Sequence, residues 1–208
     1  AISAIPPLFY KYSEDDVYGY YKEIACSVSI PVMIYYNTNA GFNMSAKFAA
    51  RLYEIDNVTA IKWTSSDYYG MMMVKELTHG EMNVINGPDE MLLCGLSMGA
   101  DAGIGSTYNV LCSEYVKLYD LFMKGDIRAA QEQQYKINKV VTLIIKYGVI
   151  RSIKYILTLL GIDSGEAVFP GTPLTDLEKA YSANASWANS LVDANVLNVL
   201  QKQCKACK

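Results

Sequence analysis

Several features common in proteins are missing from this sequence. It has one histidine, His79, in 208 residues, so neither a histidine-based catalytic triad nor a histidine-rich zinc site is available. No apolar run reaches about 18 residues, the length of a membrane-spanning helix, and residues 1–7 lack the basic start of a secretion signal. Charged residues form no block, and the net charge of −3 argues against a nucleic-acid partner. Membrane and nucleic acid are therefore not expected as partners.

Cysteine is present, but its spacing does not indicate a disulfide framework. The five cysteines are an odd, scattered set, which predicts reduced thiols and a cytoplasmic location. Cys204 and Cys207 form a single C-x-x-C in a basic tail, without the second pair that a zinc site needs, so metal or redox use is the less favoured reading. Gly103-x-Gly105 lacks the rest of a dinucleotide fingerprint, so no nicotinamide cofactor is expected.

What the chain does have is a regular alternation of strand-like and helix-like segments. Strands are predicted at 1–8, 30–36, 58–62, 82–85 and 102–105. Helices are predicted at 14–26, 44–55, 66–78, 88–99 and 109–123. Five strand–helix repeats at short spacing indicate an α/β protein with a parallel sheet. The last third shows helical patterns only, at 126–147 and 150–160, with two further helices predicted after a loop at 169–174.

The segment Asn57–Thr64 is the most informative stretch. It is a β-branched, apolar run, typical of a buried parallel strand, and it carries one lysine, Lys62, near its end. Burial disfavours the ammonium form of a lysine and lowers its pKa, which makes the free amine a nucleophile toward carbonyl groups. The alternative is that Lys62 ends the strand and points its ammonium group into water.

Other candidate functional residues also follow predicted strands. They are Tyr35 and Tyr36, the turn 87–90, and the segment 104–106. The carboxyl ends of parallel strands meet at one edge, which is where barrels and open α/β sheets place their sites.

Four motifs in this order match a known family. They are Ile30–Tyr35, Ala60–Asp67, Asn86–Glu90 and Gly99–Asn109. The sequence closely resembles the N-acetylneuraminate lyase/dihydrodipicolinate synthase superfamily over residues 1 to about 180. These are pyruvate-dependent class I aldolases on a TIM (β/α)₈ barrel, and the resemblance is strongest to the sialic-acid lyase branch.

The resemblance implies that the chain holds strands 4–8 of such a barrel. Residues 1–124 would form βα units 4–8, and residues 125–208 a C-terminal helical extension. The amino-terminal part of the barrel would come from an upstream segment or from a separate chain. Without it, two sheet edges and much apolar surface would be exposed, so we do not expect the chain to fold alone. Family resemblance also implies a homotetramer.

Catalytic roles follow from the same resemblance. Lys62 would form a Schiff base with the ketone of a 2-oxo acid, so no cofactor or metal is expected. Tyr35 would shuttle a proton, with Tyr36 as the alternative if the register slipped by one residue. Ile104 would place its backbone carbonyl near the imine.

Substrate-binding roles are implied at five positions of the lyase branch. The residues that would hold the hydroxylated tail of a sugar acid are Thr64, Gly87, Asp89, Glu90 and Ser106. For Asp89 and Glu90 the alternative is simple helix N-terminal charge. The loop Thr38–Gly41 lacks the arginine with which the synthases grip a second carboxylate.

The expected function is cleavage of N-acetylneuraminate, or a related 2-keto-3-deoxy sugar acid, to pyruvate and an aldehyde. One alternative is a condensing enzyme of the dihydrodipicolinate synthase type, or a dehydratase of the same family. Another is a non-catalytic barrel that binds 2-oxo acids, which the departures from the family pattern at Phe9 and Thr38 would allow.

Overall fold

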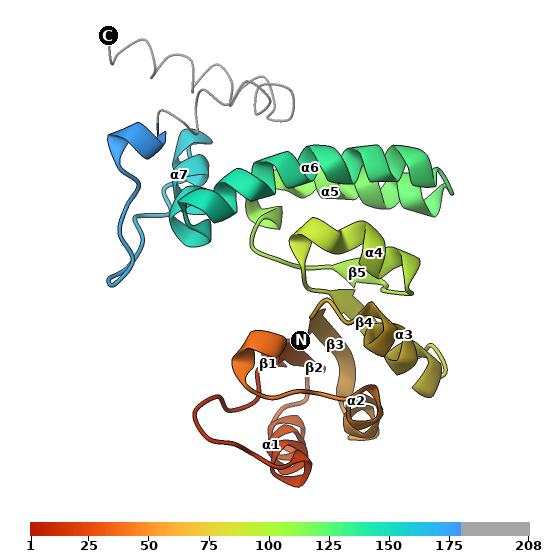
Figure 1. Cartoon of the computed structure of the whole chain (residues 1–208). Coiled ribbons are helices and arrows are strands. Elements are labelled where there is room, and N and C mark those ends of the chain that lie inside the picture. The colour runs from red at the N-terminus through yellow and green to blue at the C-terminus, as the bar shows by residue number, and fades with distance from the viewer. Residues whose placement is uncertain (180–208) are drawn as a thin grey trace. The chain divides into compact units, whose positions relative to one another are not determined.

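The structure is a computed structural model and describes residues 1–179 (Figure 1). It contains two compact units, residues 1–104 and a second unit that begins at Gly105, and each is described by itself. The two helices predicted after residue 174 and the Cys204/Cys207 pair lie largely or wholly outside the described residues. The boundary expected between residues 124 and 125 stays a prediction.

The first unit is built on a five-stranded parallel sheet whose strands follow the chain order. Its strands are β1 (Ile2–Ala4), β2 (Val32–Asn37), β3 (Val58–Thr64), β4 (Asn83–Asn86) and β5 (Ala102–Gly103). All five predicted strands are present. β1 ends before Pro6 and Pro7, because proline cannot donate a backbone hydrogen bond to a sheet. β3 extends two residues past the predicted end, since Thr64 pairs with Asn37 of β2.

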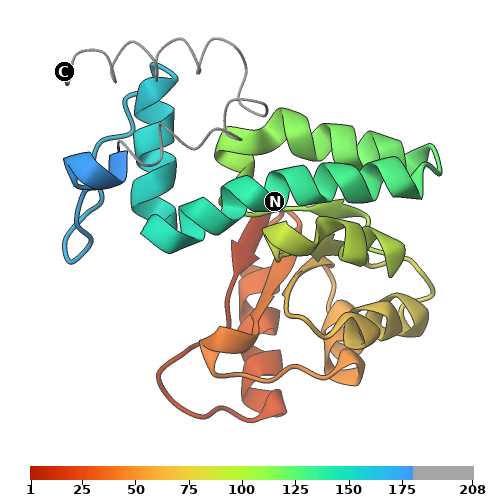
Figure 2. The ribbon, with the colours of Figure 1, turned by 45° about the horizontal axis from the view of Figure 1, so that its top comes forward.

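A helix follows each of the first four strands (Figures 1 and 2). The helices are α1 (Glu14–Ser27), α2 (Ala46–Tyr53), α3 (Tyr68–Leu77) and α4 (Leu92–Ser97). Two short 3₁₀ helices are added, η1 (Thr38–Ala40) and η2 (Asp89–Met91). The single helix predicted over 88–99 is therefore wrong in detail, because its first turn is the separate 3₁₀ helix η2.

Local sequence explains where the helices begin. Ser13 caps α1 with a reciprocal hydrogen-bond pair: the Asp16 backbone N–H donates to the serine hydroxyl, and the Ser13 N–H donates to the Asp16 carboxylate. The hydrogen bonds from Ser13 hold the pKa of Asp16 below its ordinary value. Asp67 caps α3 by accepting from the Gly70 N–H at 2.8 Å.

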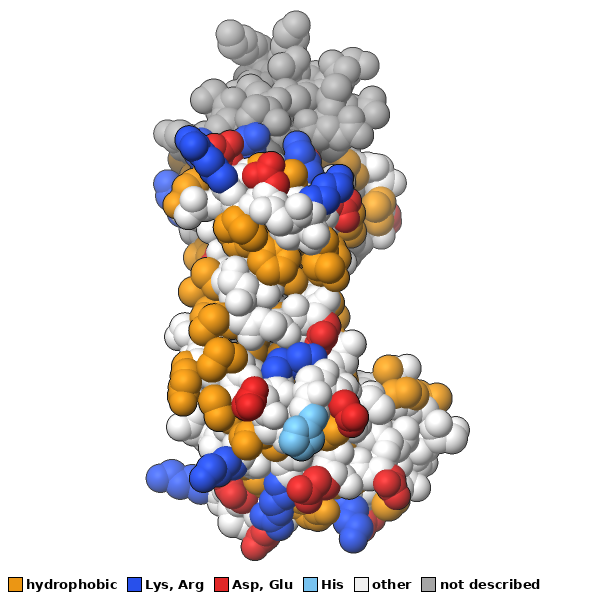
Figure 3. Space-filling view, turned by 90° about the vertical axis from the view of Figure 1, so that its right-hand side faces the viewer, with side chains coloured by type: hydrophobic (Ala, Val, Ile, Leu, Met, Phe, Trp, Pro, Cys, Tyr) orange, Lys and Arg blue, Asp and Glu red, His pale blue; other side chains and the backbone are white. Residues whose placement is uncertain are grey.

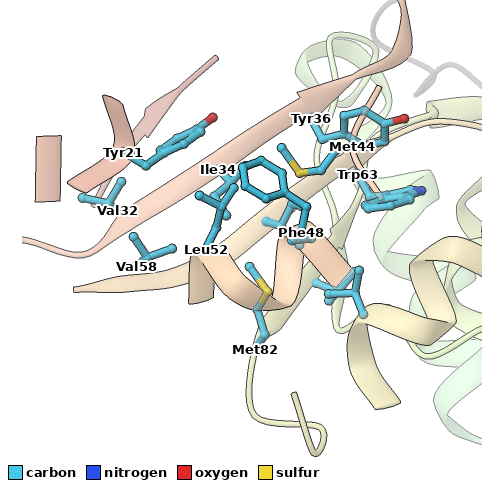
Figure 4. Packing of buried hydrophobic residues seen from close by; sticks show 14 of the residues in the cluster. Tyr21, Val32, Ile34, Tyr36, Met44, Phe48, Leu52, Val58, Trp63 and Met82 are labelled. Atoms are coloured by element: carbon cyan, nitrogen blue, oxygen red, sulfur yellow. The ribbon is translucent and has the colours of Figure 1, made fainter. Parts of the chain in front are cut away.

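The hydrophobic core lies between the helices and one face of the sheet (Figure 4). Alternate residues of the strands point into it, as the two-residue period of a strand requires. From β2 and β3 these include Val32, Ile34, Ile61 and Trp63, none more than 1% exposed. Helices α1 and α2 contribute residues such as Tyr21, Phe48 and Leu52.

The opposite face of the sheet is open within this unit. Here the intervening strand residues form rows across β2, β3 and β4: Met33 pairs with Ala60, and Tyr35 with Lys62 and then Ile85. Their side chains are partly exposed rather than buried. A hollow on this face is lined by Ser3, Met33, Thr59, Ala60, Asn83 and Ile85 among others. Parallel strands are normally covered on both faces, so this surface is incomplete in the unit as it stands.

The described residues of the second unit contain helices and no strand, and residues 162–175 are turns and irregular chain. It contains α5 (Tyr108–Met123), α6 (Ile127–Tyr147) and α7 (Val149–Leu159), close to the predicted helices. The α5–α6 contact includes a buried amide, Gln133, whose Nε2 donates to Glu114 Oε2 at 2.6 Å. In the described part of the chain, none of the helices has the length and apolarity to cross a membrane.

Candidate active site

Lys62 and Tyr35 lie side by side on the open face of the sheet. They are directly paired in the parallel register of β2 and β3. The Lys62 Nζ lies 4.0 Å from the centroid of the Tyr35 ring. Both side chains are partly buried, so the amine is accessible from the open face while it stays in contact with the tyrosine ring. An amine and a phenol in contact provide a nucleophile and a proton donor at one place.

Tyr36, the alternative to Tyr35, points to the other side of the sheet. It is 2% exposed and contacts Trp63 edge-to-face, with ring centroids 4.6 Å apart (Figure 4). Its hydroxyl donates to Asn43 Oδ1 at 3.1 Å. Burial raises the pKa of Tyr36. The two tyrosines therefore occupy opposite faces, and only Tyr35 contacts the lysine.

Thr64 and Gly87 are neighbours at the carboxyl ends of β3 and β4. The Gly87 N–H donates to the Trp63 carbonyl at 2.9 Å, so the backbone of Gly87 continues the pairing of the two strands. A Cβ on Gly87 would lie 2.1 Å from Thr64 Oγ1 and 2.8 Å from Thr64 Cα. Glycine is thus required for this close approach. Thr64 Oγ1 is buried and has no hydrogen-bond partner in the described part of the chain, which is unusual for a buried polar atom.

The turn after β4 carries the two candidate carboxylates. Asp89 is 7% exposed and Glu90 is exposed, and both belong to η2. η2 leads directly into α4, which begins at Leu92, so both acids lie in the turn that precedes this helix. Their position fits helix N-terminal charge as well as a role in binding.

Ile104 and Ser106 fall on either side of the division between the units. The Ile104 N–H donates to the Asn86 carbonyl at 3.0 Å, so its backbone lies at the carboxyl end of β4 while its side chain is exposed. Ser106 belongs to the second unit, where its carbonyl accepts from Asn109 Nδ2 at 2.8 Å. The structure brings together Tyr35 with Lys62 and Thr64 with Gly87, and it describes Ser106 only with its own unit.

Asn86 and Tyr68 were not predicted as functional residues from the sequence. Asn86 is the last residue of β4, is 0% exposed, and occupies a strand position that faces the helices. A polar residue at a core-facing position of a strand, immediately before the Gly87–Glu90 turn, was the signal that could have identified it.

The single histidine has no part in this arrangement. His79 follows the end of α3, is exposed, and lies among acidic side chains on the surface (Figure 3). Over residues 1–179, no three His, Cys, Asp or Glu side chains are grouped as metal ligands would be.

Comparisons with known proteins identify the family of this chain. The profile of the dihydrodipicolinate synthetase family matches residues 1–187. The N-acetylneuraminate lyase of Clostridium perfringens is 33% identical over 190 residues, covering 90% of this chain and 66% of the relative. The lyase of Escherichia coli is 36% identical over 166 residues, covering 79% of this chain and 56% of the relative.

Solved structures give the same result. The crystal structure of CdNal from Clostridium difficile in complex with mannosamine has a TM-score of 0.84 and 28% identity, and it covers 97% of this chain and 65% of that one. These neighbours are TIM barrels, so the five βα units are part of a (β/α)₈ barrel, as expected. The chain spans between 56% and 66% of the length of these relatives.

Proposed function

Because the chain belongs to the dihydrodipicolinate synthetase family, we propose that it carries the Schiff-base lysine of an aldolase that cleaves N-acetylneuraminate or a related 2-keto-3-deoxy sugar acid. The observation that carries the proposal is the contact between Lys62 Nζ and the Tyr35 ring at 4.0 Å on the open face of the sheet. The lyase names of the relatives favour cleavage over condensation.

The chemistry assigns one covalent step to Lys62. Its neutral amine adds to the ketone of the 2-oxo acid, and with the uptake of one proton water leaves to give an iminium ion. The substrate hydroxyl then gives up its proton, the adjacent carbon–carbon bond breaks to release an aldehyde, and the electron pair of that bond moves into the iminium to form an enamine. Protonation of the enamine and hydrolysis release pyruvate and restore the amine. Tyr35 is the group that moves the proton between the hydroxyl and the departing product.

The rest of the substrate would be held at the carboxyl ends of the strands. We assign its hydroxylated tail to Thr64, Gly87, Asp89, Glu90 and Ser106, and a position near the imine to the Ile104 carbonyl. The buried Thr64 hydroxyl and the Gly87–Glu90 turn beside it support this assignment. The binding of mannosamine by the C. difficile neighbour is consistent with an amino-sugar aldehyde as product.

The open face of the sheet implies a partner. The relatives are longer than this chain, and a parallel sheet needs cover on both faces, so we propose that the amino-terminal part of the same barrel covers Lys62 and Tyr35. It would also supply the groups that bind the pyruvate carboxylate. A homotetramer, a cytosolic location and catalysis without metal or cofactor complete the proposal.

Trapping of the imine tests the proposed function. Incubating the full-length protein with pyruvate and borohydride should leave a reduced three-carbon adduct on Lys62, detected by peptide mass spectrometry. Lys62→Arg should abolish both the adduct and turnover, whereas Lys47→Arg, at an exposed lysine on α2, should change neither. A folded protein that shows no adduct would end the proposal.

Product analysis separates the reactions that the family catalyses. Release of pyruvate from N-acetylneuraminate or 2-keto-3-deoxygluconate identifies a lyase, and loss of water without pyruvate identifies a dehydratase. Tight pyruvate binding with an adduct but no turnover would identify a binding protein.

A further inference from the structure

Two residues on the helix side of the sheet contact the turn between β4 and α4 through hydrogen bonds. We propose that Asn86 and Tyr68 are positioning residues that fix the Gly87–Glu90 turn for recognition of the sugar tail. This inference rests on the proposed function, because that function assigns the tail to this turn.

Asn86 ties the end of its strand to the turn. Its side-chain Nδ2 donates to the Pro88 carbonyl at 2.7 Å, and its Oδ1 accepts from the Tyr68 hydroxyl at 3.2 Å. The side chain is fully buried on the helix side of the sheet, opposite the face that carries Lys62. A buried amide must satisfy both its donor and its acceptor, so these two contacts specify one orientation.

Tyr68, at the start of α3, reaches the far end of the same turn. Its hydroxyl lies 3.4 Å from the Met91 carbonyl as well as 3.2 Å from Asn86 Oδ1. Burial, followed by the nearby Cys94 and Glu90, raises the pKa of the Tyr68 phenol, so it stays a neutral hydrogen-bond donor. The single hydroxyl proton is shared between the Met91 carbonyl and Asn86 Oδ1. Pro88 and Met91 flank Asp89 and Glu90, so Asn86 and Tyr68 contact the turn on both sides of the two carboxylates.

Helix α4 has a glycine, Gly95, at the position where it packs against Asn86. A Cβ on Gly95 would lie 2.4 Å from Asn86 Oδ1 and 2.7 Å from its Cβ. The helix therefore packs directly on the amide and leaves it no alternative position. Imine formation takes place on the other face of the sheet and does not use this turn. Loosening the network should weaken binding of the tail without changing the reaction of Lys62 with pyruvate.

The test is Tyr68→Phe in the full-length protein, which removes one hydroxyl and keeps the ring. We expect KM for the sugar acid to rise about 3- to 10-fold, the effect of one hydrogen bond. The rate of pyruvate trapping by borohydride should stay within about twofold of the wild-type rate. Tyr69→Phe, the same change at the exposed neighbouring tyrosine, should leave both quantities unchanged.

A second variant probes the contact with Pro88. Asn86→Asp places a carboxylate oxygen against the Pro88 carbonyl, and only the protonated acid can donate to it. The increase in KM relative to wild type should therefore be large at neutral pH and shrink as the pH is lowered. The increase in Tyr68→Phe should not depend on pH.

The outcomes distinguish this inference from the proposed function. A wild-type protein that traps no pyruvate ends both. A wild-type protein that traps pyruvate and cleaves the sugar acid, combined with an unchanged KM in Tyr68→Phe, overturns the positioning role alone. An equal loss of trapping and of sugar-acid affinity also overturns it, because a general structural defect would lower both.

Discussion

At the scale of single residues, the two adjacent tyrosines of β2 have different surroundings and should have different functions. Tyr35 contacts Lys62, whereas Tyr36 is buried against Trp63 and hydrogen-bonded to Asn43. Tyr35→Phe should lower kcat about 10²- to 10⁴-fold by removing a proton-transfer group, while pyruvate trapping at Lys62 persists. Tyr36→Phe should keep kcat and cost about 1 kcal/mol in the free energy of unfolding. Steady-state kinetics and denaturant unfolding measure the two effects, and the reverse pattern would make Tyr36 the proton shuttle.

Gly87 is the residue whose side-chain size matters most at the site. A Cβ there would contact both the hydroxyl and the backbone of Thr64, at 2.1 and 2.8 Å. Gly87→Ala should destabilise the protein by about 1–3 kcal/mol, the usual cost of overpacking, and should lower affinity for the sugar acid. Gly19→Ala is the control, since a Cβ in that part of α1 meets nothing within 4 Å. It should stabilise by up to about 1 kcal/mol. Equal effects of the two substitutions in thermal unfolding would contradict this reading of the site.

At the scale of secondary-structure elements, the contact between α1 and β1 makes the free energy of unfolding depend on pH. Tyr21 is fully buried and its hydroxyl donates to the Ala4 carbonyl at 2.7 Å. Burial raises the pKa of Tyr21 above the value of about 10 expected in the unfolded chain. Its contribution to stability is therefore complete below pH 10. Above that pH the unfolded chain releases the proton and the folded protein retains it, so the free energy of unfolding falls.

The expected size of this effect is up to about 1.4 kcal/mol per pH unit above pH 10. Urea unfolding of the full-length protein between pH 8 and pH 11 measures it. Tyr21→Phe should reduce the slope, at the cost of the hydrogen bond to Ala4. Tyr10→Phe, at an exposed tyrosine of the same unit, should leave the slope as it is. A slope that persists in Tyr21→Phe would assign the alkaline loss of stability to other groups.

The sequence predicted helices α1 and α3 and strand β3 well, because the signals for these elements are local. Capping by Ser13 and Asp67 and the apolar period of β3 depend on a few neighbouring residues, and the structure has helices and a strand there. The Gly87–Glu90 turn was predicted less well. Its conformation depends on contacts from Tyr68 and Gly95, which lie on two different helices. No local pattern encodes such contacts, so η2 was read as the first turn of a longer helix.

At the scale of the whole molecule, the residues alone predicted a parallel α/β fold with its site at the carboxyl ends of the strands, and the resemblance added the barrel. Five βα repeats fit an open sheet as well as a partial barrel. Local periodicity also gave no reason to prefer Tyr35 over Tyr36. What separates them is the register of β2 against β3, in which Tyr35 pairs with Lys62, and register is a property of two strands.

A substitution on the open face of the sheet tests whether the rest of the barrel covers this face. Ile85 lies on this face, where it pairs with Lys62 and lines the hollow together with Met33 and Ala60. Chain 1–208 expressed alone should self-associate and bind a hydrophobic dye, because its apolar face is uncovered. Ile85→Ser should reduce both effects. In the full-length protein the same change should lower the free energy of unfolding by about 2–5 kcal/mol, because the proposed amino-terminal part of the barrel would bury this side chain.

Leu77→Ser, on the exposed side of α3, is the matched control and should change neither protein appreciably. Size-exclusion chromatography, dye fluorescence and urea unfolding give the three readouts. The sign of the Ile85 effect is decisive, since one substitution should improve the behaviour of the isolated chain and impair the full-length protein. An isolated chain that is monomeric and binds no dye would mean that its own residues cover the face, and the amino-terminal part of the barrel would then not be the missing partner.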